Sequence, residues 1–210
     1  SEKLLDKALN LISGRLGLDH DRVLKSPYSL PLIVRYLDQR GGTLTDPAER
    51  DKLLYWYAHT FLWGRYSGST ETKLSQDLSV IRGEAPDPAN VDGLISLLRR
   101  ERGDLTVHPN DFAAWSTGAR FYPLLYLMTR VCGSKDWQTG LELKQSLLGR
   151  QARLHVHHIF PKARLYEAGY TKSEVNSLAN FTFQTEETNL HLSDTAPSEY
   201  LPEIESLDSK

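Results

Sequence analysis

The sequence contains a single cysteine, Cys132, among its 210 residues. One cysteine excludes an intrachain disulfide and also excludes a zinc knuckle built on a Cys-x-x-Cys pair. Because disulfide-free chains are typical of reducing compartments, we expect a cytoplasmic protein.

Long apolar runs are missing as well. The longest, Leu30 to Val34 and Leu124 to Met128, fall far short of the roughly 20 residues that cross a bilayer. We therefore expect no transmembrane helix and no membrane partner. The N-terminus lacks the basic and then apolar layout of a secretory signal and starts directly in a helical pattern, which indicates a segment of a longer protein. The chain also has no Gly-rich phosphate-binding loop, so we do not expect it to hydrolyse nucleotides by itself.

The composition is ordinary for a globular protein, with 40% hydrophobic and 25% charged residues. The net charge of −2 hides an asymmetry along the chain. Residues 94–172 carry twelve Lys and Arg against six Asp and Glu, whereas residues 173–210 carry one against eight. A basic stretch suits a phosphate-binding surface, although a solvated helical face explains it equally well.

The first two thirds of the sequence predict helices. Apolar residues recur at three- and four-residue spacing from Leu4 to Ile12 and from Leu53 to Leu62. The aromatic residues near Trp56 share this spacing, so we expect most of them in a core. Further helices are expected at 71–81, 91–102 and 121–131, and Pro109 is expected to open one that carries Phe112 and Trp115.

The helical period is lost after Cys132, where glycine and polar residues indicate loops. We expect short strands at 154–158 and 179–184 and short helices at 189–194 and 198–204. The predicted organisation is a helical domain at 1–135 and a small second domain at 136–210, in an α+β fold.

Three histidines lie within four positions, at His155, His157 and His158. In an extended segment His155 and His157 share one face and His158 points to the other. Neighbouring histidines can then have separate functions, one holding a metal ion and the other moving protons. Two asparagines follow, Asn180 and Asn189, whose amides can supply a neutral oxygen ligand or a fixing hydrogen bond.

The ordered set His157-His158, Asn180 and Asn189 resembles the HNH, or ββα-metal, endonucleases. The resemblance is greatest to the C-terminal nuclease domain of GmrSD-type modification-dependent restriction enzymes. Leu192-Ser193-Asp194 and Glu199-Tyr200-Leu201 resemble the closing segment of that domain, and Trp63 to Ser69 resembles the helical region before it. The resemblance is strong for residues 154–201 and weak before them.

The resemblance implies a metal-dependent DNA endonuclease of a restriction or antiviral defence system. It assigns His157 and Asn189 as metal ligands, His158 as the general base and Asn180 as the orienting residue. It also implies DNA as substrate, an upstream NTP-dependent domain or subunit, and 5′-phosphate and 3′-hydroxyl products. A homodimer is a further expectation if both strands are cut.

The identity of the metal ion stays open. We expect a divalent cation, with Mg²⁺ or Mn²⁺ first. Many family members have Asp where this chain has His157, and imidazole in place of carboxylate favours Mn²⁺, Ni²⁺, Co²⁺ or Zn²⁺ over Mg²⁺. His155 and His191 are secondary candidates for ligands, and Ser193 is expected to share the helical face of Asn189.

Two other functions remain compatible with the sequence. One is a non-catalytic DNA- or partner-binding module whose HNH site is degenerate at His157. The other is a zinc-stabilised structural domain, which requires closed four-coordinate ligation by His155, His157, His191 and one more ligand.

Overall fold

The computed structural model describes residues 2–19, 23–114, 121–144 and 154–208. These residues are mainly helical, with one two-stranded antiparallel sheet near the C-terminus, so the α+β class is confirmed at this level. The chain divides into two compact units, Ser1–Val107 and His108–Lys210. In the part of the chain that the structure describes, no helix combines the length and the apolar character needed to cross a bilayer.

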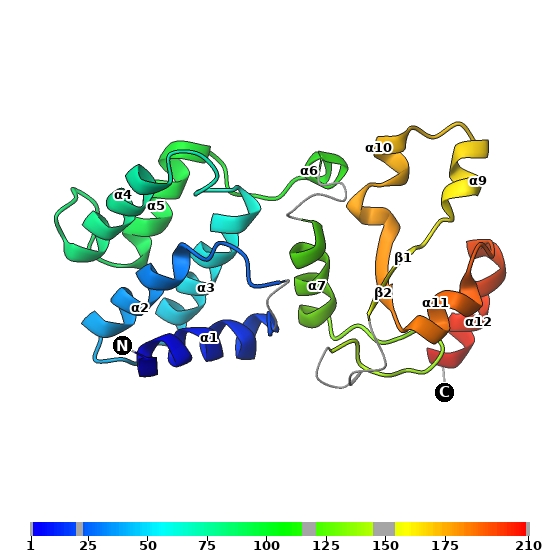
Figure 1. Ribbon diagram of the computed structural model, residues 1–210, viewed down its shortest axis with the longest axis horizontal. Coiled ribbons are helices and arrows are strands. Elements are labelled where there is room, and N and C mark those ends of the chain that lie inside the picture. Colours follow the sequence, from blue (N-terminus) through cyan, green and yellow to red (C-terminus); the bar gives the residue numbers. More distant parts are fainter. Residues whose placement is uncertain (1, 20–22, 115–120, 145–153, 209–210) are drawn as a thin grey trace. The chain divides into compact units, whose positions relative to one another are not determined.

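Unit 1 is helical (Figure 1). Its helices are α1 (Glu2–Leu16), α2 (Ser29–Gln39), α3 (Pro47–Leu62), α4 (Thr70–Arg82) and α5 (Val91–Arg102). Helix α2 packs against α1, α3 and α4, and α5 packs against α3 and α4. Side-chain caps explain two of the starts, since Asp46 accepts a hydrogen bond from Ala48 N and Asn90 accepts from Asp92 N. The sequence predicted these helices except α2.

The core of unit 1 is aromatic and aliphatic, and it encloses one ion pair. Trp56 and Tyr57 are fully buried, as their helical spacing predicted, whereas the neighbouring Tyr55 is 39% exposed. Arg65 donates to both carboxylate oxygens of Asp77 at 2.7 Å, and both side chains are buried. The charge pair is thus fully hydrogen-bonded, which a buried pair requires.

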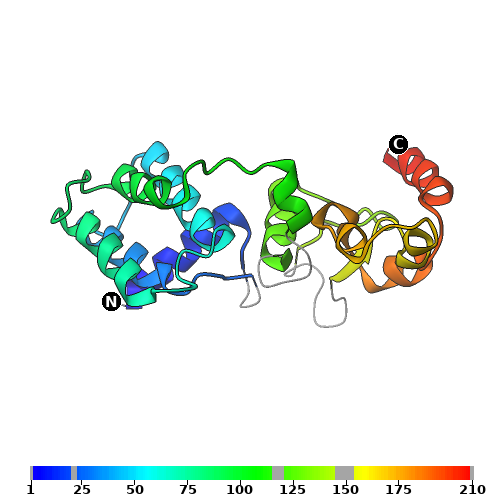
Figure 2. The same ribbon diagram turned by 90° about the horizontal axis from the view of Figure 1, so that it is seen from above.

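Unit 2 contains the candidate site. Its elements are α6 (Pro109–Ala114), α7 (Phe121–Val131), β1 (His155–His158), α9 (Lys162–Glu167), α10 (Lys172–Val175), the 3₁₀ turn η1 (Leu178–Asn180), β2 (Phe181–Gln184), α11 (Glu186–Leu192) and α12 (Pro197–Asp208). Figure 2 shows α12 as the last element, beyond α11 at the C-terminal end.

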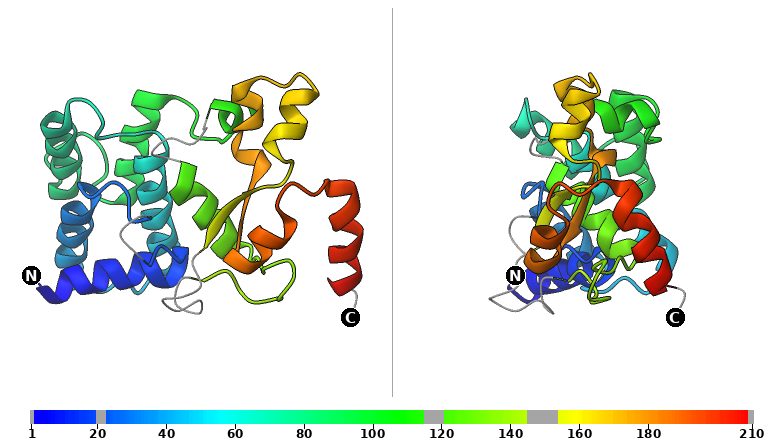
Figure 3. Two further views of the ribbon diagram at one scale, coloured as in Figure 1. Left: turned by 45° about the vertical axis from the view of Figure 1, so that its right-hand side comes forward. Right: turned by 90° about the vertical axis from the view of Figure 1, so that its right-hand side faces the viewer.

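Strands β1 and β2 form an antiparallel pair in which His155 lies opposite Gln184 and His158 opposite Phe181. Helix α7 packs against β2 (Figure 3). The ring of Tyr126 meets Phe183 edge-on, with 5.9 Å between centroids. Because α7 packs on this sheet, the division of the chain lies at 107/108. The boundary expected at 135/136 falls inside unit 2.

Several local predictions differ from the structure. Strand β2 begins at Phe181, because residues 178–180 form the 3₁₀ turn η1. Helix α11 spans 186–192 and not 189–194, because Thr185 caps its N-terminus. The helix ends before Ser193, which is exposed and has a φ of +42°, so Ser193 does not extend the helical face of Asn189. Helices α9 and α10 were not predicted, and Trp115 lies outside the described residues.

Candidate functional site

Strand β1 places its three histidines in different surroundings. His157 is buried, with 4% of its surface exposed, whereas His155 and His158 are partly exposed. Successive side chains of a strand point to opposite faces, so His157 and His158 reach different neighbours.

His157 meets Asn189 of α11. The Nδ1 atom of His157 lies 3.0 Å from Oδ1 of Asn189, although 32 residues separate the two in sequence. Local structure explains the meeting. Thr185 follows β2 directly and accepts a hydrogen bond from Thr188 N, so α11 turns back along β1 with Asn189 in its first turns. Burial lowers the pKa of His157, and the hydrogen bond with Asn189 opposes this shift.

His158 lies against Phe181 of β2, with 4.1 Å between the ring centroids. Burial and the positive charge of Lys162 lower the pKa of His158, a hydrogen bond with the Asn176 side chain opposes them, and the net pKa is about 4. Within the described residues, the buried Nε2 atom of His158 has no hydrogen-bond partner. A neutral imidazole with an unused nitrogen can accept a proton, and its low pKa makes it a weaker base at neutral pH than an ordinary histidine.

Asn180 fastens the segment that follows β1. Its Oδ1 accepts a hydrogen bond from Phe160 N at 2.7 Å, and its Nδ2 donates to Phe160 O at 3.1 Å and to Val175 O at 3.0 Å. The backbone carbonyl of Asn180 also accepts from Ile159 N at 2.9 Å. Asn180 therefore fixes the chain beside His158, and its side chain contacts backbone atoms, not the imidazole.

Asp136 joins the loop before β1 to α11, a function that its sequence neighbourhood, typical of a turn, does not indicate. Its buried carboxylate accepts hydrogen bonds from Thr185 N at 2.8 Å and from the Thr188 hydroxyl at 2.6 Å. It also accepts from the backbone of Gln138 and Thr139. Burial raises the pKa of this carboxyl, but the hydrogen bonds outweigh it and hold the pKa below its usual value. The carboxylate thus secures the start of the helix that carries Asn189.

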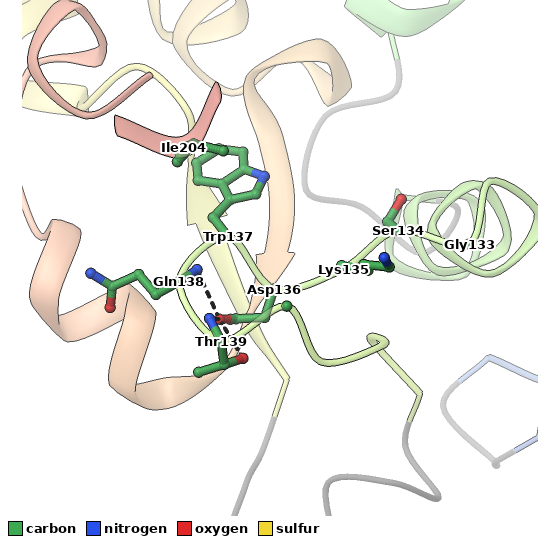
Figure 4. Close-up of a pocket in the computed structure, with 9 residues that line it drawn as sticks. Gly133, Ser134, Lys135, Asp136, Trp137, Gln138, Thr139 and Ile204 are labelled. Atoms are coloured by element: carbon green, nitrogen blue, oxygen red, sulfur yellow. Dashed lines mark hydrogen bonds between the residues drawn. The ribbon is translucent and has the colours of Figure 1, made fainter. Parts of the chain in front are cut away.

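Trp137 covers one side of His157. The two rings meet edge-on at 5.9 Å between centroids, and Trp137 stacks on Tyr200 of α12 at 5.5 Å. Figure 4 shows Trp137 beside Ile204 of α12, at an open cavity of about 730 Å³ along residues 133–140. No sequence pattern singles out Trp137, because its contacts come from packing between distant segments.

The other candidate ligands do not converge on His157. Nε2 of His155 lies 3.9 Å from a carboxylate oxygen of Glu186, and His191 is exposed. The residues that the structure describes contain no group of three or more His, Cys, Asp or Glu side chains arranged for a metal ion. These residues therefore do not form the closed zinc site that a structural zinc domain needs.

The pair of His157 and Asn189 fits an open divalent site. Adjacent ligand atoms of a six-coordinate cation, each about 2.1 Å from it, are about 3 Å apart. The hydrogen bond between Nδ1 and Oδ1 has this same separation, so a cation could replace the shared proton without moving the two residues. The Nε2 atom of His157 is also buried and lacks a partner within the described residues. Two protein ligands leave the remaining positions of such a cation to water and substrate oxygens.

Comparison with known proteins does not identify a family. No protein-family model matches the chain, and no solved structure matches it. An uncharacterized protein of Methanocaldococcus jannaschii is 25% identical over 165 residues, which cover 76% of this chain and 26% of that relative. The chain therefore spans about a quarter of the length of this relative.

Proposed function

We propose that unit 2 is an HNH-type endonuclease domain that hydrolyses DNA phosphodiester bonds with a divalent metal ion. The observation that carries the proposal is the contact between His157 Nδ1 and Asn189 Oδ1 at 3.0 Å, on a strand–strand–helix unit whose next histidine is free to act as a base. The order of these residues in the sequence is the basis of the resemblance to the HNH endonucleases, which supports the same proposal.

His157 and Asn189 would hold the cation, with Mg²⁺ or Mn²⁺ as first candidates and Ni²⁺, Co²⁺ or Zn²⁺ as alternatives. When bound, such a cation neutralises charge on the phosphate and acidifies bound water. Nε2 of His158 takes the proton of the attacking water as its oxygen bonds to phosphorus. The bond from phosphorus to the 3′ oxygen breaks, and that oxygen leaves as a hydroxyl after taking a proton from solvent.

Asn180 supports this chemistry without touching the substrate. Its three side-chain hydrogen bonds fix residues 160 and 175, between which the chain makes its excursion through α9 and α10. A general base must be held in position by the chain that carries it, because even a small displacement of a catalytic side chain greatly reduces the reaction rate.

The setting of the domain belongs to the same proposal. A restriction or antiviral enzyme of the cytoplasm, with an upstream NTP-dependent domain or subunit and a dimer for double-strand cleavage, agrees with the resemblance. The single cysteine agrees with a reducing compartment.

The test is nicking of supercoiled plasmid by the purified chain with each of the five metal ions, beside an EDTA control. We expect nicking that depends on metal and is lost in His158→Ala, whereas His155→Ala, a change on the same strand, retains it. His158→Ala should still bind metal. Absence of nicking by wild type with every ion, together with DNA binding that ignores metal, would favour the alternative of a non-catalytic binding module.

A further inference from the structure

An apolar pocket opens directly after the strand that carries the histidines. It measures about 400 Å³ and is lined by Phe160, Leu165, Tyr170 and Ala179, with Glu174 and Ser177 at polar positions. Phe160 and Tyr170 are 49% and 50% exposed. Its volume lies in the range of roughly 300–1,000 Å³ that is usual for small-ligand pockets.

The wall of this pocket is fixed relative to the candidate base. Phe160 lies two residues after His158, and Asn180 binds both the N–H and the C=O of Phe160. Tyr170 is held at the end of α9 by a backbone hydrogen bond from its N–H to Leu165 O at 3.0 Å. A group bound against Phe160 would therefore contact a residue whose backbone is fixed two positions after His158.

Basic residues follow both aromatic residues of the pocket. Lys162 lies two residues after Phe160 and Lys172 two residues after Tyr170, and both lysines are exposed. Arg164 is exposed and donates only its Nε to Asp194 O, at 3.0 Å. Inside, Glu174 accepts hydrogen bonds from Thr171, and its carboxylate disfavours a second anion. A ligand that matches these features has a flat uncharged group that fits the apolar pocket and phosphates that contact Lys162 and Lys172.

We propose that this pocket binds one unpaired nucleobase of the DNA substrate, stacked against Phe160 and Tyr170, while Lys162 and Lys172 contact the flanking phosphates. The inference rests on the proposed nuclease function and adds the substrate class, which is single-stranded DNA or duplex with a mismatched or extruded base. Stacking on aromatic side chains tolerates any base, because every base has a π-face. Extrusion from a perfect duplex costs a few kcal/mol, so the pocket favours DNA that is already unpaired.

The test measures binding separately from cleavage. The full chain carrying His158→Ala is titrated, in EDTA, against a fluorescently labelled 20-nucleotide oligo-dT and against a matched perfect duplex, by anisotropy. We expect tighter binding of the single strand. Adding Phe160→Ala or Tyr170→Ala should weaken it roughly five- to a hundredfold, the range for loss of one stacked base. Tyr166→Ala is the matched control, because Tyr166 is 47% exposed on α9 but does not line the pocket.

The outcomes separate this proposal from the nuclease assignment. Unchanged oligonucleotide binding in both pocket variants overturns the base pocket, even where wild type nicks plasmid. Equal weakening by Tyr166→Ala overturns it too, since the effect would then be a general surface property. A dimer that dissociates in Phe160→Ala, with binding unchanged, would assign the pocket to a second copy of the chain. Selective weakening in a chain that never nicks would retain the pocket and reject catalysis.

Discussion

The Nδ1 atom of His157 and the Oδ1 atom of Asn189 lie 3.0 Å apart, one on strand β1 and the other on helix α11. Asp136 maintains this relationship from a third segment, because its carboxylate binds Thr185 and Thr188 at the N-terminus of the same helix. Three stretches that are distant in sequence thus determine one pair of candidate ligands.

Removal of either ligand should weaken metal binding before it affects the fold. We expect His157→Ala and Asn189→Ala each to reduce Mn²⁺ affinity roughly tenfold or more, by analogy with the effect of disturbing ligand shells elsewhere. Isothermal titration calorimetry measures this directly. His191→Ala, an exposed change two residues from Asn189, is the control and should bind Mn²⁺ like wild type. If His157→Ala and Asn189→Ala bind Mn²⁺ as tightly as wild type and His191→Ala do, the assigned ligand pair is contradicted.

Asn180 should matter for stability as well as for activity. In Asn180→Ala three backbone groups, Phe160 N, Phe160 O and Val175 O, lose their partner. Because an unsatisfied buried group costs about 1–3 kcal/mol, and these groups are partly buried, we expect a loss of about 2–4 kcal/mol in the free energy of unfolding of unit 2. Urea denaturation measures it. Asn176→Ala should cost less, because the Asn176 side chain has one exposed hydrogen bond to Lys172 O and one with the His158 ring, and no buried backbone group loses its partner. A loss no larger than that of Asn176→Ala would argue against the fastening function of Asn180.

Asp136→Asn tests the link between the loop and α11. An amide retains the size of the carboxylate but loses its charge and one acceptor oxygen, so we expect lower stability. The pKa of Asp136 is lowered in the folded state, so its stabilising contribution is present above the unfolded pKa near 4 and is lost as pH falls through the lower folded value. Thermal unfolding from pH 3 to 7 should show a smaller difference between wild type and Asp136→Asn at the acid end. A difference that grows on acidification would refute this account.

His59 in unit 1 should show acid-dependent behaviour of its own. Burial lowers the pKa of His59 to about 4, and the charge of Arg99 contributes in the same direction. Its Nδ1 accepts a hydrogen bond from Trp63 Nε1 at 2.8 Å, which requires the unprotonated nitrogen. The unfolded chain therefore binds a proton between pH 6.5 and 4 that the folded chain does not. The free energy of unfolding consequently decreases as the pH is lowered through this window, by up to about 1.4 kcal/mol per pH unit.

The titration of the His59 ring can be followed by NMR in the intact chain. We expect a midpoint well below 6.5 in wild type and a higher midpoint in Arg99→Gln, because that change removes a repelling charge. A wild-type midpoint at the ordinary value for histidine would show that the ring is accessible to protons. Arg35→Gln, which removes an exposed charge paired with Asp38 on α2, is the control.

The sequence predicted the parts of this molecule that depend on local patterns. Apolar spacing and caps such as Asp46 and Asn90 located the helices of unit 1, with the exception of α2, whose short apolar run carries Pro31 in its first turn. The alternation Phe181-Thr182-Phe183 located β2, and the order of His157, Asn180 and Asn189 identified residues that the fold brings close to β1.

The remaining features depend on contacts that no local pattern encodes. Helix α7 packs on β2 through Tyr126 and Phe183 and so belongs to unit 2. The division between the units therefore lies at 107/108 and not at the expected 135/136. Trp137 and Asp136 lie in a stretch whose composition indicates only a turn, yet they cover His157 and anchor α11. Such functions arise when segments distant in sequence meet, and no local pattern shows which segments those will be.

The amide of Asn180 binds both the N–H and the C=O of Phe160, as a neighbouring strand would, and reaches Val175 as well. The Asn180 side chain therefore links the two ends of the segment from Phe160 to Val175, which forms a loop closed at its base. Residues inserted or deleted within that loop would change what projects from the domain while leaving the histidines in place. This arrangement gives evolution, or an engineer, a location at which the projecting residues can be altered without rebuilding the candidate site.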